Sequence, residues 1–323
     1  MRKLGHEEQA LLAQLRAAGF KTASQISLEA SRAGLTQMAL SMAGPKVAVH
    51  AVHDERIAGP GGELGIRIYD PDPGSRAGPG VIVFFHGGGY YLGNLETHDH
   101  VCRFLCAHSR LPVVAVDYRL APEHKFPAAL DDCYSVVRWV AAQAASRGWD
   151  PHRIALVGDS AGGGLVASVC LLARAKGGPR IAYQVLVYPA LTLDNGADFP
   201  SRKDLGSGEY FIAEEDWPYF RGLYLRDPER EASLPLVSPV RASDFRGLPP
   251  ALIVAAEFDP CRDENARYAE LLRSAGVPTE YVCFEGTIHP FFLFDGILEA
   301  GRRGQALVAD RVHRAIGTAA APG

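Results

Sequence analysis

The sequence predicts an α/β fold built on a mostly parallel sheet with helices on both faces. From residue 81 onward, short apolar runs alternate with longer stretches of helical periodicity, which is the pattern of parallel strands joined by helical crossovers. The runs are apolar at every position, and this indicates strands that are covered on both sides. The content of 47% hydrophobic and 22% charged residues is that of an ordinary globular chain.

Taken in order, the elements begin with an antiparallel pair at the sheet edge, in "VAVHAV" (47–52) and "LGIRIY" (64–69), because a turn-rich segment follows them. Six parallel strands are then expected at 81–85, 113–117, 154–157, 183–188, 251–256 and 280–284. The expected helices cover 98–108, 128–147, 161–176, 263–275 and 299–316. The sum is an eight-stranded sheet flanked by helices.

Two stretches do not follow this alternation. Residues 1–45 contain helical segments before any strand, and residues 191–235 include the aromatic run "EYFIAEEDWPYFRGLYL", which we expect to be helical. They could form a helical cap over the carboxyl ends of the strands, where open α/β sheets bind ligands, or a peripheral insertion outside the site. In the first case, 46–190 and 236–323 are the two parts of the core.

Composition excludes several classes of function. The chain has 33 basic and 37 acidic residues, so we expect no field that would hold nucleic acid or an anionic membrane, and a small uncharged substrate is favoured. The amino terminus has acidic residues where a signal peptide would be apolar, and no apolar run approaches the roughly 18–20 residues of a membrane span.

The cysteines and histidines bear on the cellular compartment and on metal binding. Six cysteines without a C-x-x-C pair indicate free thiols in a reducing compartment, hence a cytoplasmic protein. The "HDH" at 98–100 has neither nearby cysteines nor an H-E-x-x-H pattern. We therefore expect no metal and no cofactor.

The segment "VGDSAGGG" (157–164) places Ser160 between a strand and a helix. Gly158 and Gly162 give the small-x-Ser-x-small spacing of a nucleophile elbow, a turn too sharp for larger side chains. Each glycine in the helix costs about 0.8–1 kcal/mol relative to alanine, which implies a need for close approach. Tight strand–helix packing or a phosphate cradle would also use glycines, but no G-x-x-x-x-G-K-[ST] occurs in the chain.

A second glycine cluster, "HGGG" (86–89), follows the strand at 81–85. Glycines leave backbone N–H groups uncovered, and such groups can bind a developing negative charge. Gly87 and Gly88, together with the N–H of Ala161, are the candidate donors. His86 precedes the glycines and is expected to order their loop.

His289 is the candidate base. It lies on the loop "EGTIHPFF" after the strand at 280–284, whereas His313 falls inside the last helix and the other histidines precede Ser160. A satisfied core histidine is the alternative. Pro290 follows it, which removes an N–H and favours an extended backbone at the histidine.

Asp259 is the candidate acid, because it stands just beyond the strand at 251–256, where a carboxylate could hold the imidazole in one tautomer. Glu257 and Asp263 are close rivals, and Asp194 is a more distant one. The order serine, aspartate, histidine is that of α/β-hydrolases.

With these residues the chain resembles the hormone-sensitive-lipase-like family of α/β-hydrolase carboxylesterases. The resemblance is carried by "HGGG", "DYRLAPEHKFPA", "GDSAGG", "SPV", "GLPPALIVAAEFDPCRDE", "AGVPTEY" and "IHPFF". It implies an α/β-hydrolase fold with a helical cap, cofactor-free hydrolysis of short- to medium-chain acyl esters, and it allows a homodimer paired through the edge strand at 280–284. The roles that it implies are a triad of Ser160, Asp259 and His289, oxyanion donors at Gly87, Gly88 and Ala161, and loop bracing by Asp117, Arg119 and Glu123. The family usually has glycine where this chain has Pro290.

An apolar pocket beneath the cap is expected to be lined by Tyr90, Tyr91, Phe211, Trp217 and Phe291. An amidase or carbamate hydrolase would share the same acyl-enzyme chemistry. A non-catalytic receptor of the same fold is a more distant alternative, since it has no need of His289.

Overall fold

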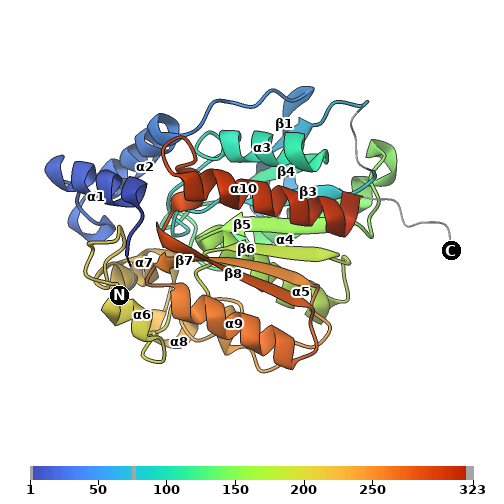
Figure 1. Ribbon diagram of the computed structural model, residues 1–323. Helices are drawn as coiled ribbons and strands as arrows, with labels where there is room; N and C mark the ends of the chain where they lie inside the picture. The colour runs from blue at the N-terminus through green and yellow to red at the C-terminus, as the bar shows by residue number, and fades with distance from the viewer. Residues whose placement is uncertain (1–2, 75–77, 318–323) are drawn as a thin grey trace.

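A single eight-stranded sheet crosses the centre of the computed structural model, which describes residues 3–74 and 78–317 (Figure 1). Its strand order is β1-β2-β4-β3-β5-β6-β7-β8; β2 is antiparallel to both its neighbours, and the other pairs are parallel. The strands are β1 Ala51–Gly59, β2 Gly62–Asp70, β3 Val81–Phe85, β4 Val113–Asp117, β5 Ile154–Asp159, β6 Tyr183–Val187, β7 Ala251–Phe258 and β8 Thr279–Ile288. The predicted fold class and the six parallel strands are confirmed.

Helices cover both faces of this sheet. The core helices are α3 Asp99–Ser109, α4 Ala128–Gln143, α5 Ala161–Lys176, α9 Arg262–Ser274 and α10 Glu299–Val312. Helices α3 and α10 pack on one face, and α4, α5 and α9 pack on the other (Figure 1). Strand β3 shows why its sequence is apolar throughout: Ile82 and Phe84 join the cluster under α3 and α10, whereas Val83 joins the opposite one.

Strand boundaries differ from the prediction at both sheet edges. Strand β1 begins at Ala51 and not at residue 47, and it pairs with β2 as far as the Gly59–Gly62 turn. It contains His53, Asp54 and Glu55, since an edge strand faces water on one side, and an apolar run is therefore the wrong criterion for it. Strand β8 extends to Ile288, because it pairs with β7 again beyond an irregularity near Ala256.

The two stretches outside the alternation lie together at one end of the sheet (Figure 1). The first contains α1 His6–Ala17 and α2 Leu28–Met42, and the second contains α6 Pro200–Asp204, α7 Asp216–Tyr224 and α8 Pro228–Glu231. They are tied to each other where the Ser24 N–H donates to Asp216 at 2.8 Å. The aromatic run is helical only from Asp216, because residues 206–213 form a turn in which Phe211 has a φ of +86°.

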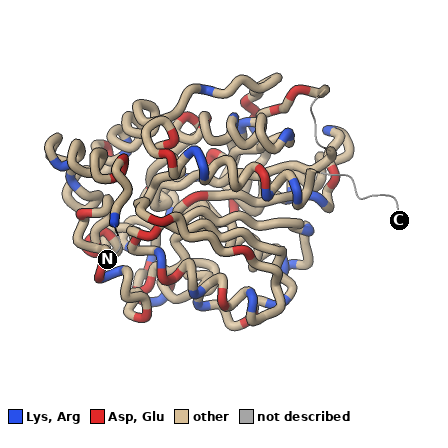
Figure 2. The backbone as a smooth tube through the Cα atoms, in the orientation of Figure 1, with Lys and Arg blue, Asp and Glu red and all other residues tan. Residues whose placement is uncertain are grey.

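Charge is mixed over the molecule. Figure 2 shows basic and acidic residues interspersed along the chain, with neither sign gathered on the part that is seen. In the described part of the chain, every helix is too short or too polar to reach across a lipid bilayer.

The glycines around Ser160 permit the close approach that the sequence implied. A Cβ atom on Gly158 would lie 2.5 Å from the Gly162 backbone, and one on Gly162 would lie 2.0 Å from the Phe85 carbonyl oxygen. Ser160 itself has a φ of +53° and directly follows β5, so that α5 starts at once with Ala161. Helix α5 is therefore pressed against the ends of β3 and β5.

Replacing Gly162 by alanine should destabilise the fold by about 1–3 kcal/mol or more, because the new methyl group meets backbone that cannot move aside. Gly222→Ala on α7 is the matched control: nothing lies within 4 Å of its Cβ position, so it should be neutral or stabilising by up to about 1 kcal/mol. Urea unfolding of both variants measures the difference. Equal tolerance of the two changes would contradict the packing argument.

Candidate active site

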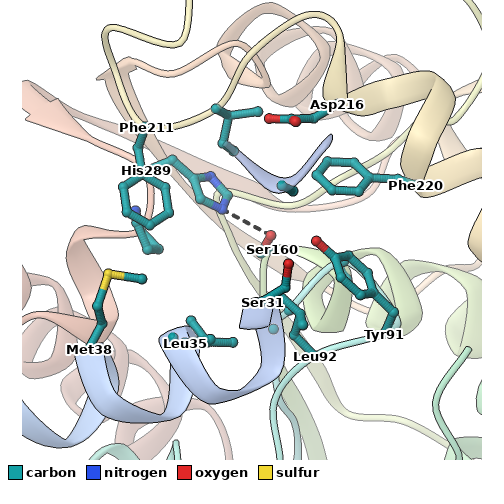
Figure 3. Close-up of a pocket in the computed structure, with 18 of the residues that line it drawn as sticks. Ser31, Leu35, Met38, Tyr91, Leu92, Ser160, Phe211, Asp216, Phe220 and His289 are labelled. Atoms are coloured by element: carbon teal, nitrogen blue, oxygen red, sulfur yellow. Dashed lines mark hydrogen bonds between the residues drawn. The ribbon is translucent and has the colours of Figure 1, made fainter. Parts of the chain in front are cut away.

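Ser160, His289 and Asp259 form one line of polar contacts at the carboxyl ends of the parallel strands. Figure 3 shows the contact between His289 and Ser160. His289 Nε2 lies 2.9 Å from Ser160 Oγ, and His289 Nδ1 lies 2.9 Å from Asp259 Oδ2. Ser160 follows β5, Asp259 follows β7 and His289 follows β8 directly, so three crossovers deliver the three side chains to one edge. Asp259 is fully buried and His289 is 4% exposed.

The rival carboxylates are engaged elsewhere. Glu257 accepts the Gly286 N–H at 2.9 Å, and Asp194 pairs with Arg241 at 2.6 Å. Asp263 accepts the Ser201 N–H at 2.8 Å. Of the candidate acids, Asp259 is the one beside the imidazole.

Tyr188 is a neighbour of the imidazole that the sequence analysis missed. Its ring centroid lies 4.3 Å from that of His289, and its side chain is fully buried. It stands at the end of β6 with a φ of +33°, so its ring is directed at the histidine rather than along the sheet. An aromatic residue at the end of an apolar run was the only sequence signal for it.

The N–H of Gly87 donates to Asp159 Oδ1 at 2.9 Å, so it is not available to an oxyanion. This corrects the sequence-based assignment of Gly87. In the described ranges, the N–H groups of Gly88, Gly89 and Ala161 donate no hydrogen bond within the protein, and all three residues line the pocket. The physical reason is that Asp159, buried directly before the nucleophile, needs donors of its own.

Asp159 is held from a second side by His98, whose Nε2 lies 3.2 Å from its Oδ1. Thr97 Oγ1 lies 2.8 Å from the other ring nitrogen of His98. Burial opposes ionisation of Asp159, but His98 and the Gly87 N–H outweigh it and hold the pKa of this carboxyl below its usual value. The "HDH" segment is thus used in internal contacts, and His100 meets Asp295 at 3.1 Å.

His86 orders the glycine loop. Its Nδ1 lies 2.8 Å from the Gly87 carbonyl oxygen, and its ring stacks on Tyr118 at 4.1 Å. The Tyr118 hydroxyl in turn donates to the His86 carbonyl oxygen at 2.7 Å. Burial lowers the pKa of His86 to about 3, which keeps the ring neutral.

A cavity of about 500 Å³ opens above Ser160. Its lining includes the predicted Tyr90, Tyr91, Phe211 and Trp217, and the additional apolar residues Phe20, Ile26, Leu35, Met38, Ile212, Phe220 and Leu293. Residues from α2 and α7 close it on the side away from the sheet (Figure 3). The described residues include no group of three or more His, Cys, Asp or Glu side chains that could hold a metal ion.

Phe291 is not among the lining residues, contrary to expectation. It is fully buried, with its ring 5.3 Å from Tyr188 and 5.2 Å from Phe284. The short helical turn Phe291–Leu293 that follows His289 directs Phe291 into the core, whereas Pro290 and Leu293 line the cavity.

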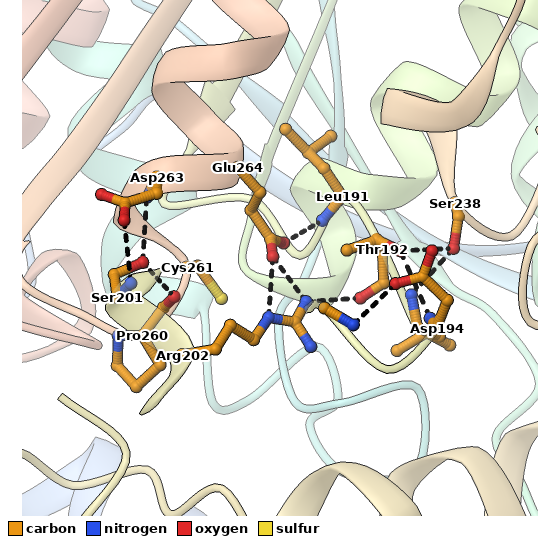
Figure 4. A network of polar contacts seen from close by, with 12 residues as sticks. Leu191, Thr192, Asp194, Ser201, Arg202, Ser238, Pro260, Cys261, Asp263 and Glu264 are labelled. Atoms are coloured by element: carbon orange, nitrogen blue, oxygen red, sulfur yellow. Dashed lines mark hydrogen bonds and ion pairs between the residues drawn. The ribbon is translucent and has the colours of Figure 1, made fainter. Parts of the chain in front are cut away.

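A buried ion pair anchors the second outlying stretch to the core (Figure 4). Arg202 on α6 donates from Nε to Glu264 on α9 at 2.9 Å and from Nη2 to the Thr192 carbonyl oxygen at 2.6 Å. The other oxygen of Glu264 accepts the Leu191 N–H at 2.7 Å. The Arg202 guanidinium lies 3.6 Å from the centre of the Trp217 ring, so the network supports one wall of the cavity.

The first outlying stretch is anchored by Arg32 on α2. Its guanidinium donates to both carboxylate oxygens of Glu123 at 2.8 Å and to the carbonyl oxygens of Tyr91 and Ala121 at 3.0 Å. Glu123 thus braces a loop, as the resemblance implied.

Comparison with known proteins gives the family. A model of the alpha/beta hydrolase fold matches residues 82–293. The carboxylic ester hydrolase LipN of Mycobacterium tuberculosis is 42% identical over 267 residues, which are 81% of this chain and 69% of that protein. The arylesterase of Saccharolobus solfataricus is 40% identical over 254 residues, 78% of this chain and 80% of that one.

Among solved structures, a hyperthermophilic esterase from the archaeon Pyrobaculum calidifontis is 40% identical and superposes with a TM-score of 0.90, covering 97% of this chain and 98% of the other. The fold and these matches define an α/β hydrolase. More particularly, the chain belongs to the hormone-sensitive-lipase-like family of carboxylesterases. Its reaction is the hydrolysis of carboxylic esters.

The neutral, buried His86 should make the fold sensitive to acid. At pH values between its ordinary pKa of 6.5 and about 3, His86 is protonated in the unfolded chain but not in the native state. The free energy of unfolding therefore decreases as the pH is lowered, by up to about 1.4 kcal/mol per pH unit. We expect His86→Asn to reduce this slope in urea unfolding between pH 4.5 and 7. The exposed His124→Asn is the control, and an unchanged slope in His86→Asn would contradict the assignment.

Proposed function

We propose that this carboxylesterase hydrolyses short- to medium-chain acyl esters with Ser160 as nucleophile, His289 as base and Asp259 as acid. The observation that carries the proposal is the unbroken line of two 2.9 Å contacts that ends at the floor of the cavity. A nucleophile, a base and an orienting carboxylate at hydrogen-bonding distance are what acyl-enzyme chemistry requires.

The proposed reaction has two steps. His289 takes the Ser160 proton as Oγ attacks the ester carbonyl carbon; the ring then gives that proton to the departing alcohol, which leaves an acyl-enzyme. A water molecule deprotonated by His289 attacks the acyl carbon and releases the carboxylic acid. Asp259 holds the tautomer with Nδ1–H and stabilises the imidazolium; its second oxygen is fixed by the Cys261 N–H at 2.8 Å.

The N–H groups of Gly88, Gly89 and Ala161 are the proposed oxyanion donors. They are without partners in the described protein and line the cavity that holds Ser160. Ala161 begins α5, and the first N–H groups of a helix carry partial positive charge. Such a donor has been worth about 2.7–4 kcal/mol of transition-state stabilisation where one was removed.

The cavity supports a small substrate. At about 500 Å³ and with a mainly apolar lining, it falls within the usual range for small-molecule pockets, about 300–1,000 Å³. The similar arylesterase suggests aryl esters as convenient assay substrates. A cytoplasmic location and a homodimer belong to the same proposal: the six cysteines are free thiols, and β8 lies at an edge of the sheet.

Ser160→Ala should lower kcat for a short aryl ester by about four to six orders of magnitude if the three side chains act as a unit. Ser168→Ala, a buried serine further along α5, is the matched control and should keep most of the activity. A fluorophosphonate probe should label wild type and Ser168→Ala but not Ser160→Ala. Retention of most activity by Ser160→Ala would refute the assignment.

Across p-nitrophenyl esters from acetate to palmitate, kcat/KM should peak at a short or medium chain and fall for palmitate, because a cavity of about 500 Å³ has little room for a long chain. The measurement is initial rate against concentration below the solubility limit of each ester. A rate that rises steeply on emulsified long-chain triglyceride would contradict this preference.

A further inference from the structure

A pair of hydroxyl groups outside the triad interrupts the apolar wall of the cavity. Ser31 comes from α2 and Tyr91 from the loop after β3, and both line the cavity. Figure 3 shows their hydroxyl groups directed toward one another and toward the space around Ser160. The side chains are 6% and 1% exposed.

The Ser31 hydroxyl is not satisfied within the described protein. Ser31 Oγ is buried without a hydrogen-bond partner in the described protein, and the hydroxyl group that it faces is that of Tyr91 (Figure 3). Burial raises the pKa of Tyr91 well above its usual value, so this group stays a donor. An unpaired buried hydroxyl is costly and rare in native structures, which marks this pair as one that a ligand completes.

The pair is also held rigidly. The Tyr91 ring is clamped by Tyr219 at 5.9 Å, edge to face, and by Phe220 at 5.7 Å. Arg32, the neighbour of Ser31, binds the Tyr91 carbonyl oxygen at 3.0 Å. The tyrosine hydroxyl therefore cannot turn away to solvent when a substrate enters.

Among the other polar groups of the cavity, the Trp217 indole N–H is also buried without a partner, but it carries no hydroxyl group. Asp216 uses both carboxylate oxygens to accept the N–H groups of Ser24 and Ala213 at 2.8 and 3.0 Å. Gln37 and Ser41 are exposed, at the outer end of α2. Tyr91 therefore offers a buried hydroxyl donor in the cavity lining, away from the triad.

We propose that Tyr91, positioned by Ser31, is a specificity-determining residue that selects esters carrying a hydrogen-bond-accepting oxygen on the chain that lies against α2. The Ser31 hydroxyl can donate to Tyr91 Oη and leave the Tyr91 O–H for an ether, carbonyl or hydroxyl oxygen of the substrate. A pure hydrocarbon chain would leave that donor unpaired. Sites built to hydrogen-bond a substrate group reject an analogue without it far more strongly than they reject an extra methylene. This inference rests on the proposed function of Ser160.

The experiment compares isosteric aryl esters in which one methylene, two or more bonds from the ester, is replaced by an ether oxygen, in one series on the acyl side and in another on the alcohol side. For each pair the ratio of kcat/KM, ether over hydrocarbon, is measured in wild type, Tyr91→Phe and Ser31→Ala. Tyr219→Phe, a neighbouring tyrosine outside the cavity lining, is the matched control. Comparing ratios between variants cancels the intrinsic reactivity of each ester.

We expect the ratio to fall about 10-fold or more in Tyr91→Phe in one of the two series. The ratio should also fall in Ser31→Ala, and it should be unchanged in Tyr219→Phe. In Tyr91→Phe, kcat/KM should fall less for the hydrocarbon ester than for its ether analogue, whereas a general loss of structure would lower both equally. Equal ratios in wild type and Tyr91→Phe in both series would overturn the inference. Failure of the proposed function is distinguished by fluorophosphonate labelling, which would then not depend on Ser160.

Discussion

The contact between the first turn of α5 and the ends of β3 and β5 is the constraint on which the site depends. With a Cβ at Gly158 or Gly162, the helix could not start where it does, and Ser160 could not hold its positive φ between strand and helix. That start places the Ser160 hydroxyl above the sheet and the Ala161 N–H beside it. The glycines therefore give up helix stability for the placement of one oxygen and one amide.

The same region of the structure links the nucleophile directly to the glycine loop at 86–89. Asp159, next to Ser160 in the chain, accepts the Gly87 N–H and meets His98. The loop is thus fastened to the elbow by a buried carboxylate and not only by its own turn. Because Gly87 is committed to this bond, the next two glycines are left to face the cavity.

Periodicity was enough to predict elements buried on both sides. The strands at 81–85 and 113–117 and the helix at 161–176 have the predicted limits, because each is apolar or small at nearly every position. The edge strand β1 was misplaced, since half of its residues face water and the apolar run ends before the hydrogen bonds do.

The site was predictable in its chain order but not in its hydrogen bonds. Ser160, Asp259 and His289 follow recognisable strands, and the structure brings them together. The engagement of Gly87 depends on a residue 72 positions away, and the burial of Phe291 depends on the direction of one short turn. Such tertiary contacts leave no periodic signal in the sequence.

The Arg202–Glu264 pair has a consequence for how a substrate can enter. Pulling α6 away from α9 would strand an uncompensated carboxylate in the protein interior, which costs about 3–5 kcal/mol when such pairs are broken. The part of the cavity wall that α6 supports is therefore held in a fixed position. Trp217, which packs against Arg202, keeps its place whether or not the cavity is filled. Separating α6 from α9 is therefore the more costly way to open the cavity, because α2, on the other wall, is held by the more exposed ion pair between Arg32 and Glu123.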